Sequence, residues 1–233
     1  IIDGFFTSTS AVCVTGLITL DTATHWNYFG KTVIIILIQI GGLGFMSFTT
    51  LFALILKKKI RLRERLVLQE AMNTFGIQGL VRLMRYILIF TFSIEFMGSF
   101  LYATQFVPQF GVLKGIYYSV FASISAFCNA GFDLMGYDEA YSSLVSFEGD
   151  VLVNVVVIFL ILTGGIGFVV WDDLMRNKWH FKKYLLHTKI VLTFTIGLTV
   201  IATIAFLVLE NHGVLAGLTP VEKALGAAFC SVT

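Results

Sequence analysis

Two short segments of this chain repeat each other, and each leads to a glycine. Residues 6–17 read FTSTSAVCVTGL and residues 121–132 read FASISAFCNAGF, so six of the twelve positions are identical at an offset of 115 residues. In both copies a stretch of Ser, Ala and Cys gives way to a glycine, Gly16 in the first and Gly131 in the second. The chain contains no nucleophile–base pair and no metal-ligand spacing, so enzyme chemistry has no support.

The backbone around the two glycines could instead bind a cation. Gly adopts left-handed dihedrals without steric cost, and this freedom lets successive carbonyls turn inward and replace the hydration shell of an ion, as in potassium filters. A short helix before each glycine would direct the negative end of its dipole at the ion. We expect K⁺ in this filter, with Na⁺ as the alternative, and no covalently bound cofactor. The expected ligands are the backbone carbonyls of Val14, Thr15, Gly16, Asn129, Ala130 and Gly131.

A third copy begins at the end of the chain. Phe229, Ser231 and Thr233 repeat the F-x-S-x-[ST] spacing of the first two copies. Each glycine follows the last residue of this spacing by six positions, so we expect another glycine about six residues beyond Thr233. The chain also begins without an initiator Met, and we expect it to be about half of a longer subunit.

The elements that hold these segments are expected to be membrane helices. Hydrophobic residues make up 57% of the chain and charged residues only 13%, with a mean hydropathy of +0.88. A soluble domain carries about 25% charged residues. A bilayer core needs roughly 20 apolar residues, and four stretches are long and apolar enough. They lie at about 31–56, 84–107, 150–171 and 185–209.

The basic residues predict the orientation of these spans. Thirteen of the 16 Lys and Arg residues lie in two clusters, one around residues 57–85 and one around 176–189. The positive-inside rule places the loops 57–65 and 176–183 in the cytoplasm of a multi-pass protein of the plasma (inner) membrane, with the filters facing outside. The first run is not read as nucleic-acid binding, because apolar spans bracket it.

The two glycine-terminated segments are too short to cross the membrane. Residues 2–14 and 114–128 are apolar or small, as in re-entrant segments, which must be buried in protein or line a water-filled path. Two crossings separate the copies, so both enter from the same side. We expect an all-α polytopic membrane protein with parallel M1–P–M2 repeats, whose re-entrant pore helices surround a central ion pore. The repeats would be divided at residues 1–65, 66–183 and 184–233.

A second motif recurs after each copy, and it predicts close packing. Residues 41–45 read GGLGF and residues 164–168 read GGIGF, each within a span. Small residues let helix backbones approach each other closely in membranes. We expect these glycines to pack against the re-entrant segments.

The segments FTSTSAVCVTGLITLDT and SAFCNAGFDL, with the two triple-glycine motifs, resemble the Trk/Ktr/HKT superfamily of potassium transporters, most of all its KtrB-type membrane subunit. The resemblance covers essentially the whole chain. It implies potassium uptake through a channel-like pore of four M1–P–M2 repeats, with Gly16 and Gly131 as the first and second filter glycines. Related pores with weaker potassium preference carry Ser at the first of these positions. The third and fourth filter glycines and the gating loop would lie outside this chain.

The resemblance also implies partners. Family members form a dimer of pore subunits on a cytosolic ring of nucleotide-binding regulatory proteins, the KtrA/TrkA-type RCK subunits. The loops 57–65 and 176–183 are on the side expected to face such a ring. Topology signalling alone explains the first loop equally well, and it is the favoured explanation for the second.

Three acidic residues have open interpretations. Glu95 lies in mid-span, where an ionisable residue is a functional candidate or a partnered group that fastens helices together. Asp21 and Asp133 follow their filter glycines and could attract cations at the outer mouth. For Asp133, capping or ordering of the loop is equally consistent. The rival function is a secondary transporter, sodium-coupled or for another cation, although the polar clusters that bind substrates in such proteins are scarce here.

Overall fold

The described part of the chain is helical, with no strand among the described residues. The computed structural model describes residues 1–44, 80–137, 140–178, 180–211, 213, 215 and 217–233. The α-helices are α1 (Ile2–Cys13), α2 (Thr22–His25), α3 (Tyr28–Leu43), α6 (Leu80–Phe110), α7 (Val112–Phe127), α8 (Val151–Gly165), α9 (Phe168–Asn177), α10 (Leu186–Leu209) and α11 (Pro220–Val232). Two short 3₁₀-helices, η1 (Ser143–Phe147) and η2 (Phe181–Lys183), lie in the connections.

Among the described residues, two helices are long and apolar enough to cross a membrane by themselves. They are Arg85–Phe110, with 26 residues, and α10, with 24. At about 1.5 Å per residue both exceed the roughly 30 Å of a bilayer core. These helices occupy the stretches at 84–107 and 185–209 where spans were expected, with the length and apolar composition that a span needs. Of the span expected at 31–56, α3 forms the first part, and residues 45–56 lie outside the described residues.

The span expected at 150–171 is not one straight helix, which corrects the sequence interpretation. It is broken into α8 and α9, whose axes are bent by 94°. Gly167 lies at the break with a φ of +85°. A left-handed residue interrupts the α-helical hydrogen-bond ladder, so the chain turns there. Gly44, which ends α3, has a φ of +78° at the matching place of the other triple-glycine motif.

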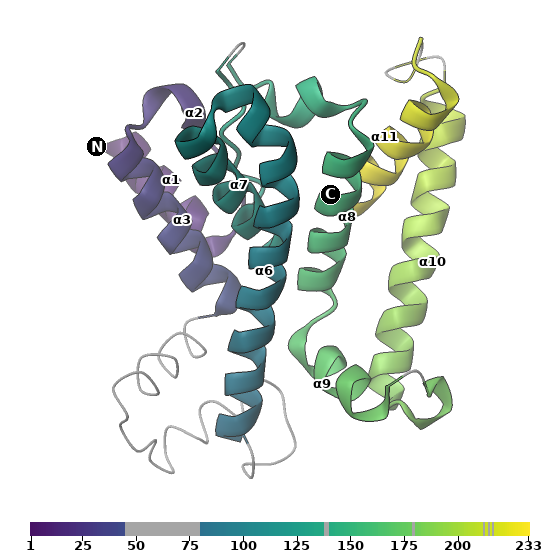
Figure 1. The fold of residues 1–233 in the computed structure, drawn as a ribbon. Coiled ribbons are helices and arrows are strands. Elements are labelled where there is room, and N and C mark those ends of the chain that lie inside the picture. The colour runs from purple at the N-terminus through teal and green to yellow at the C-terminus, as the bar shows by residue number, and fades with distance from the viewer. Residues whose placement is uncertain (45–79, 138–139, 179, 212, 214, 216) are drawn as a thin grey trace.

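Three short helices have lengths unlike those of spans. With 12, 16 and 13 residues, α1, α7 and α11 reach only about 18–24 Å. In α11, Thr219 and Glu222 form a capping box, and Pro220 lies between them at the first helical position, which together make a strong helix start. In Figure 1, α7 turns back beside α6, and the C-terminus of α11 lies midway along the height of the molecule. These lengths are too short to cross a bilayer core, and the re-entrant path expected for these segments stays a prediction.

The hydrophobic core lies where α6, α7 and α8 meet, with α1 and α3 packed beside them. Tyr102, Phe106, Phe121 and Leu160 are among its fully buried side chains. By contrast, α10 exposes most of its apolar side chains, and its only buried residue is Thr188. In Figure 1 the connection between α10 and α11 lies at the upper end and α9 at the lower end. The expected outer and cytoplasmic connections are therefore at opposite ends.

Candidate functional site

The two glycine-containing triplets, Val14–Gly16 and Asn129–Gly131, have the same backbone conformation. The first residue of each has a φ of 57°, and the glycines have φ values of 73° and 72°. The middle N–H of each triplet donates to a serine carbonyl of the preceding helix, Thr15 to Ser10 at 3.0 Å and Ala130 to Ser125 at 2.8 Å. The repeat in the sequence is thus a repeat in three dimensions.

Val14 makes this conformation informative. A β-branched residue rarely adopts a left-handed φ, because its branched side chain crowds the backbone. Such conformations persist only where the surrounding structure enforces them, and they concentrate at functional sites. Val14 and Asn129 share this conformation, although their side chains differ in chemistry. The conformation therefore follows the position in the repeat and not the residue type.

The two triplets lie against each other. An ideal β-carbon on Gly16 would be 2.5 Å from the carbonyl oxygen of Ala130 and 3.4 Å from the Cα of Gly131. In the opposite direction, a β-carbon on Gly131 would be 3.7 Å from the Cα of Gly16. Gly16 therefore satisfies two demands that only glycine meets, a left-handed φ and a close backbone neighbour. The structure brings together two of the expected walls of carbonyl groups.

Serine side chains hold both triplets to their helices. The hydroxyl groups of Ser10 and Thr15 are 2.9 Å apart in the first repeat. In the second, the hydroxyl of Ser125 donates to the carbonyl of Phe132 at 2.5 Å. The side-chain amide of Asn129, in the orientation that satisfies its hydrogen bonds, donates to the carbonyls of Ile161 and Ala126. These side chains are committed to protein partners, which is consistent with ion binding through the backbone.

The triple-glycine motifs pack against the short helices, as the sequence predicted. A β-carbon on Gly41 would overlap the carbonyl oxygen of Val12 near the end of α1. A β-carbon on Gly164 would overlap the carbonyl oxygen of Phe127 at the end of α7. Val12 and Phe127 are matched positions of the repeat. The first glycine of each motif therefore supports the chain just before each triplet.

Asp21 connects the two loops that follow the triplets. One of its carboxylate oxygens accepts hydrogen bonds from the N–H and hydroxyl of Thr24, at 2.8 and 2.9 Å, and caps α2. The other accepts from the N–H of Tyr141 at 3.0 Å, and the closely packed Gly136 leaves room for it. Desolvation would raise the pKa of Asp21, but these hydrogen bonds outweigh it and hold the pKa below its ordinary value. The carboxylate is buried, and its attraction for cations stays a prediction.

Asp133 orders the loop after the second triplet. Its carboxylate accepts a hydrogen bond from the N–H of Met135 at 2.9 Å. Burial, with a smaller effect from the charge of Asp21, raises its pKa above the ordinary value. Asp133 also lines a cavity of about 320 Å³ that reaches Asn129 and Gly131 and extends to Thr233 in the third copy. The structure thus shows the loop-ordering contact, and the role at the outer mouth is untested.

Glu95 has a partner that the sequence could not identify. The side-chain amide of Gln39 on α3 donates to its carboxylate at 2.9 Å, and Glu95 is buried. The backbone carbonyl of Glu95 accepts from the hydroxyl of Ser123 on α7 at 2.7 Å. This geometry fits the interpretation of Glu95 as a group that fastens helices together.

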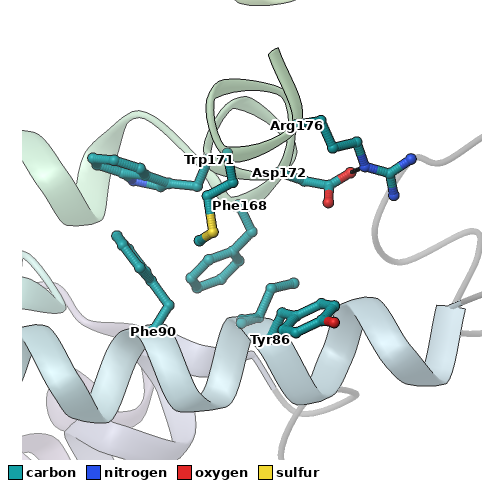
Figure 2. A pocket seen from close by; sticks show the side chains of 8 residues that line it. Tyr86, Phe90, Phe168, Trp171, Asp172 and Arg176 are labelled. Atoms are coloured by element: carbon teal, nitrogen blue, oxygen red, sulfur yellow. Dashed lines mark ion pairs between the residues drawn. The ribbon is translucent and has the colours of Figure 1, made fainter. Parts of the chain in front are cut away.

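A second cavity, of about 440 Å³, lies between α6 and α9 (Figure 2), away from the triplets. The rings of Phe90 and Trp171 are 4.6 Å apart between centroids, and the indole N–H of Trp171 donates to the carbonyl of Thr163 at 2.8 Å. At its polar side Arg176 and Asp172 form an ion pair at 2.9 Å. The sequence gives no sign of this cavity, because it depends on the bend between α8 and α9.

Comparison with known proteins finds relatives that match the whole length of this chain. The chain is 46% identical over its whole length to the Ktr system potassium uptake protein B of Bacillus subtilis (strain 168), covering 51% of that protein. It is also 46% identical to the potassium/sodium uptake protein NtpJ of Enterococcus hirae, covering 50% of it. Identity to the Ktr system potassium uptake protein B of Vibrio alginolyticus is 36%, again over the whole chain. The chain thus spans about half the length of these relatives.

The match to a family of transport proteins extends over most of the chain. The TrkH family model, described as a cation transport protein, matches residues 1–211. The matched region contains both triplets, both triple-glycine motifs and the two helices that are long enough to cross a membrane. This chain therefore belongs to the TrkH family of cation transport proteins.

Proposed function

We propose that this chain forms part of a channel-like pore for potassium uptake, in which backbone carbonyls of the two triplets line a selectivity filter. One observation carries the proposal: Val14–Gly16 and Asn129–Gly131 have matching left-handed backbones and meet at Gly16 and Ala130. Carbonyl dipoles arranged around an axis can replace the hydration shell of a cation. Each triplet would be one wall of the filter.

The helices around the triplets supply the rest of the pore. In this proposal α1, α7 and α11 are re-entrant pore helices of successive parallel M1–P–M2 repeats, with boundaries near residues 65 and 183. The C-terminal ends of α1 and α7 lead directly into the triplets, so their partial negative charge favours a cation there. The filters would open to the outside of the plasma membrane, with the 176–183 connection in the cytoplasm.

The names of relatives support a monovalent cation as the substrate. Two of them are potassium uptake proteins, and NtpJ is a potassium/sodium uptake protein. Potassium is the substrate that we propose for this chain, because glycine stands at position 16. The name of NtpJ supports sodium as the alternative substrate. Sodium would pass through the same filter or be transported together with potassium in a symport.

The names of the Ktr relatives also support a partner. They describe proteins of a system, which is consistent with the cytosolic nucleotide-binding ring expected from the family resemblance. We propose that the complete protein forms a homodimer on this ring. The connection after α9, which contains η2 and three exposed lysines, would face the ring. These lysines are Lys178, Lys182 and Lys183.

Uptake measurements on filter variants test the proposal. In the complete protein Gly131→Ser should reduce discrimination between K⁺ and Na⁺ by about tenfold, since about 1.4 kcal/mol between two ions corresponds to that factor. Gly16→Ser should reduce it further, because its β-carbon would also collide with the carbonyl oxygen of Ala130. The measurement is uptake of each ion in cells that lack their own potassium uptake systems, at equal abundance of the protein. Gly197→Ala is the control, because within the described part of the chain no atom outside its own helix turn lies within 4 Å of a β-carbon at that position. Unaltered ion preference in both filter variants would overturn the proposal.

A further inference from the structure

A side-chain hydrogen bond connects the first repeat to the second inside the membrane region. Gln39 on α3 donates from its amide nitrogen to the carboxylate of Glu95 on α6 at 2.9 Å, across 56 residues of sequence. Glu95 is 4% exposed, so this bond is shielded from water. A buried polar group without a partner is costly, which favours the geometry in which these two side chains meet.

The same residue of α6 also holds the second short helix. The hydroxyl of Ser123 on α7 donates to the backbone carbonyl of Glu95 at 2.7 Å, and Ser123 is fully buried. A β-carbon on Gly98 would be 2.5 Å from that hydroxyl, so glycine lets α6 approach α7 closely. Ser123 lies six residues before the triplet that begins at Asn129. Glu95 is therefore attached to the helix that carries the second triplet.

The helix that carries Gln39, α3, also contacts Cys128, the residue just before the second triplet. A β-carbon on Gly42 would overlap the sulfur of Cys128, the residue immediately before Asn129. Gln39 and Gly42 are three residues apart and share a face of α3. The Gln39–Glu95 hydrogen bond thus helps to position α3, the helix of the first repeat that packs against Cys128.

We propose that Gln39 and Glu95 are positioning residues for the ion filter, which hold the second triplet in register with the first through a hydrogen bond between repeats. This inference rests on the proposed function of the triplets. Neither side chain touches the ion in this proposal. The pair acts through α3 and α7, whose contacts at Cys128 and Ser123 fix the approach of Asn129–Gly131 to Gly16.

The geometry predicts that hydrogen bonding, and not the charge of Glu95, is what matters. The amide oxygen of Gln39 is buried and has no hydrogen-bond partner among the described residues. A glutamine at position 95 would still accept from the Gln39 amide nitrogen, and its own amide could donate to that oxygen. Glu95→Gln should therefore preserve the contact, whereas alanine at either position removes it.

The test compares ion preference in variants of the complete protein at equal abundance in the membrane. Glu95→Ala and Gln39→Ala should each lower the ratio of K⁺ to Na⁺ uptake by about threefold, in line with the modest strength of hydrogen bonds between membrane helices. Glu95→Gln should keep the ratio of the unchanged protein. Gln39→Glu should lower the ratio, because it places two carboxyl groups against each other. The double variant Gln39→Glu with Glu95→Gln exchanges the two side chains and should restore the ratio.

Ser99→Ala is the matched control. Its hydroxyl donates to the same carbonyl of Glu95, at 2.8 Å, but from within α6, so its loss should leave the ratio unchanged. If Glu95→Gln lowers the ratio of K⁺ to Na⁺ uptake as much as Glu95→Ala does, the charge is essential and the inference is wrong. The inference is also wrong if both alanine variants keep the ratio while Gly16→Ser changes it. If the alanine variants do not accumulate in the membrane, Gln39→Glu takes their place, and an unchanged ratio in that variant contradicts the inference in the same way. If Gly16→Ser and Gly131→Ser also keep the ratio, the proposed filter itself fails.

Discussion

The carbonyl oxygen of Ala130 lies 2.5 Å from the position that a β-carbon on Gly16 would occupy, so the two triplets meet at this pair of residues. The relationship is not symmetric. A β-carbon on Gly131 would meet its nearest neighbour, the Cα of Gly16, at an ordinary 3.7 Å. Both glycines have left-handed φ values, but only Gly16 also has a backbone oxygen in the way.

This asymmetry predicts a ranking of filter variants. Gly131→Ala carries only the conformational cost of a left-handed residue, roughly 1–2 kcal/mol, and should lower the K⁺/Na⁺ uptake ratio by up to about tenfold. Gly16→Ala carries this cost and the collision with Ala130, so it should lower the ratio further. Parallel uptake assays at matched abundance give the order, and a larger effect at Gly131 would contradict the geometry.

Gly164 should be a determinant of stability. A β-carbon there would overlap the backbone oxygen of Phe127, which cannot rotate away, so Gly164→Ala should destabilise the protein by about 1–3 kcal/mol. The expected result is lower abundance and a lower melting temperature in detergent. Gly197→Ala, with no described atom outside its own helix turn within 4 Å of the new β-carbon, should leave both unchanged. Equal melting temperatures for the two variants would exclude this close packing.

Asp21 should stabilise the outer loops as a carboxylate. Its pKa is lowered in the folded protein, so its contribution is present above the pKa of an unfolded aspartate, about 4, and is lost as pH falls through the folded value. Asp21→Asn should cost about 1–3 kcal/mol, because an amide cannot accept hydrogen bonds on both sides, from Thr24 and from Tyr141. Melting curves of both proteins from about pH 3 to 7 should converge at the acidic end. Curves that stay parallel would contradict this role.

Asp133 should behave in the opposite way. Its pKa is raised, so ionisation opposes folding, and the associated stability is lost as pH rises from the unfolded pKa through the folded one. Asp133→Asn can still accept from the N–H of Met135 and should therefore stabilise the protein at neutral pH. If the carboxylate also attracts cations, the same variant should raise the K⁺ concentration needed for half-maximal uptake. Unchanged uptake would leave only the loop-ordering role.

The orientation can be tested with single cysteines in the complete protein after its native cysteines are replaced. Val145, in the connection after the second triplet, is exposed, and Lys182 lies in η2 at the opposite end. In intact cells an impermeant thiol reagent should label Val145→Cys and not Lys182→Cys. Permeabilised cells should allow labelling of both. Labelling of position 182 from outside would reverse the proposed orientation.

Much of the arrangement was readable in the sequence because it depends on local properties. The spans at 84–107 and 185–209 follow from length and hydropathy, and both are helices in the structure. The left-handed conformation expected at Gly16 and Gly131 follows from the conformational freedom of glycine, and both residues have it. The packing of the triple-glycine motifs on the short helices followed from the repeat and from residue size.

The partners of particular side chains were decided only by the tertiary structure. Gln39 and Glu95 are 56 residues apart, and Asp21 and Tyr141 are 120 apart. No local pattern relates such residues, because their distance is set by how helices from different repeats pack. The bend at Gly167 is also absent from the hydropathy pattern, because an apolar run of this length is predicted to be one continuous span. Sequence thus determined the repeating unit, and tertiary packing decided how the two units fit together at Gly16 and Ala130.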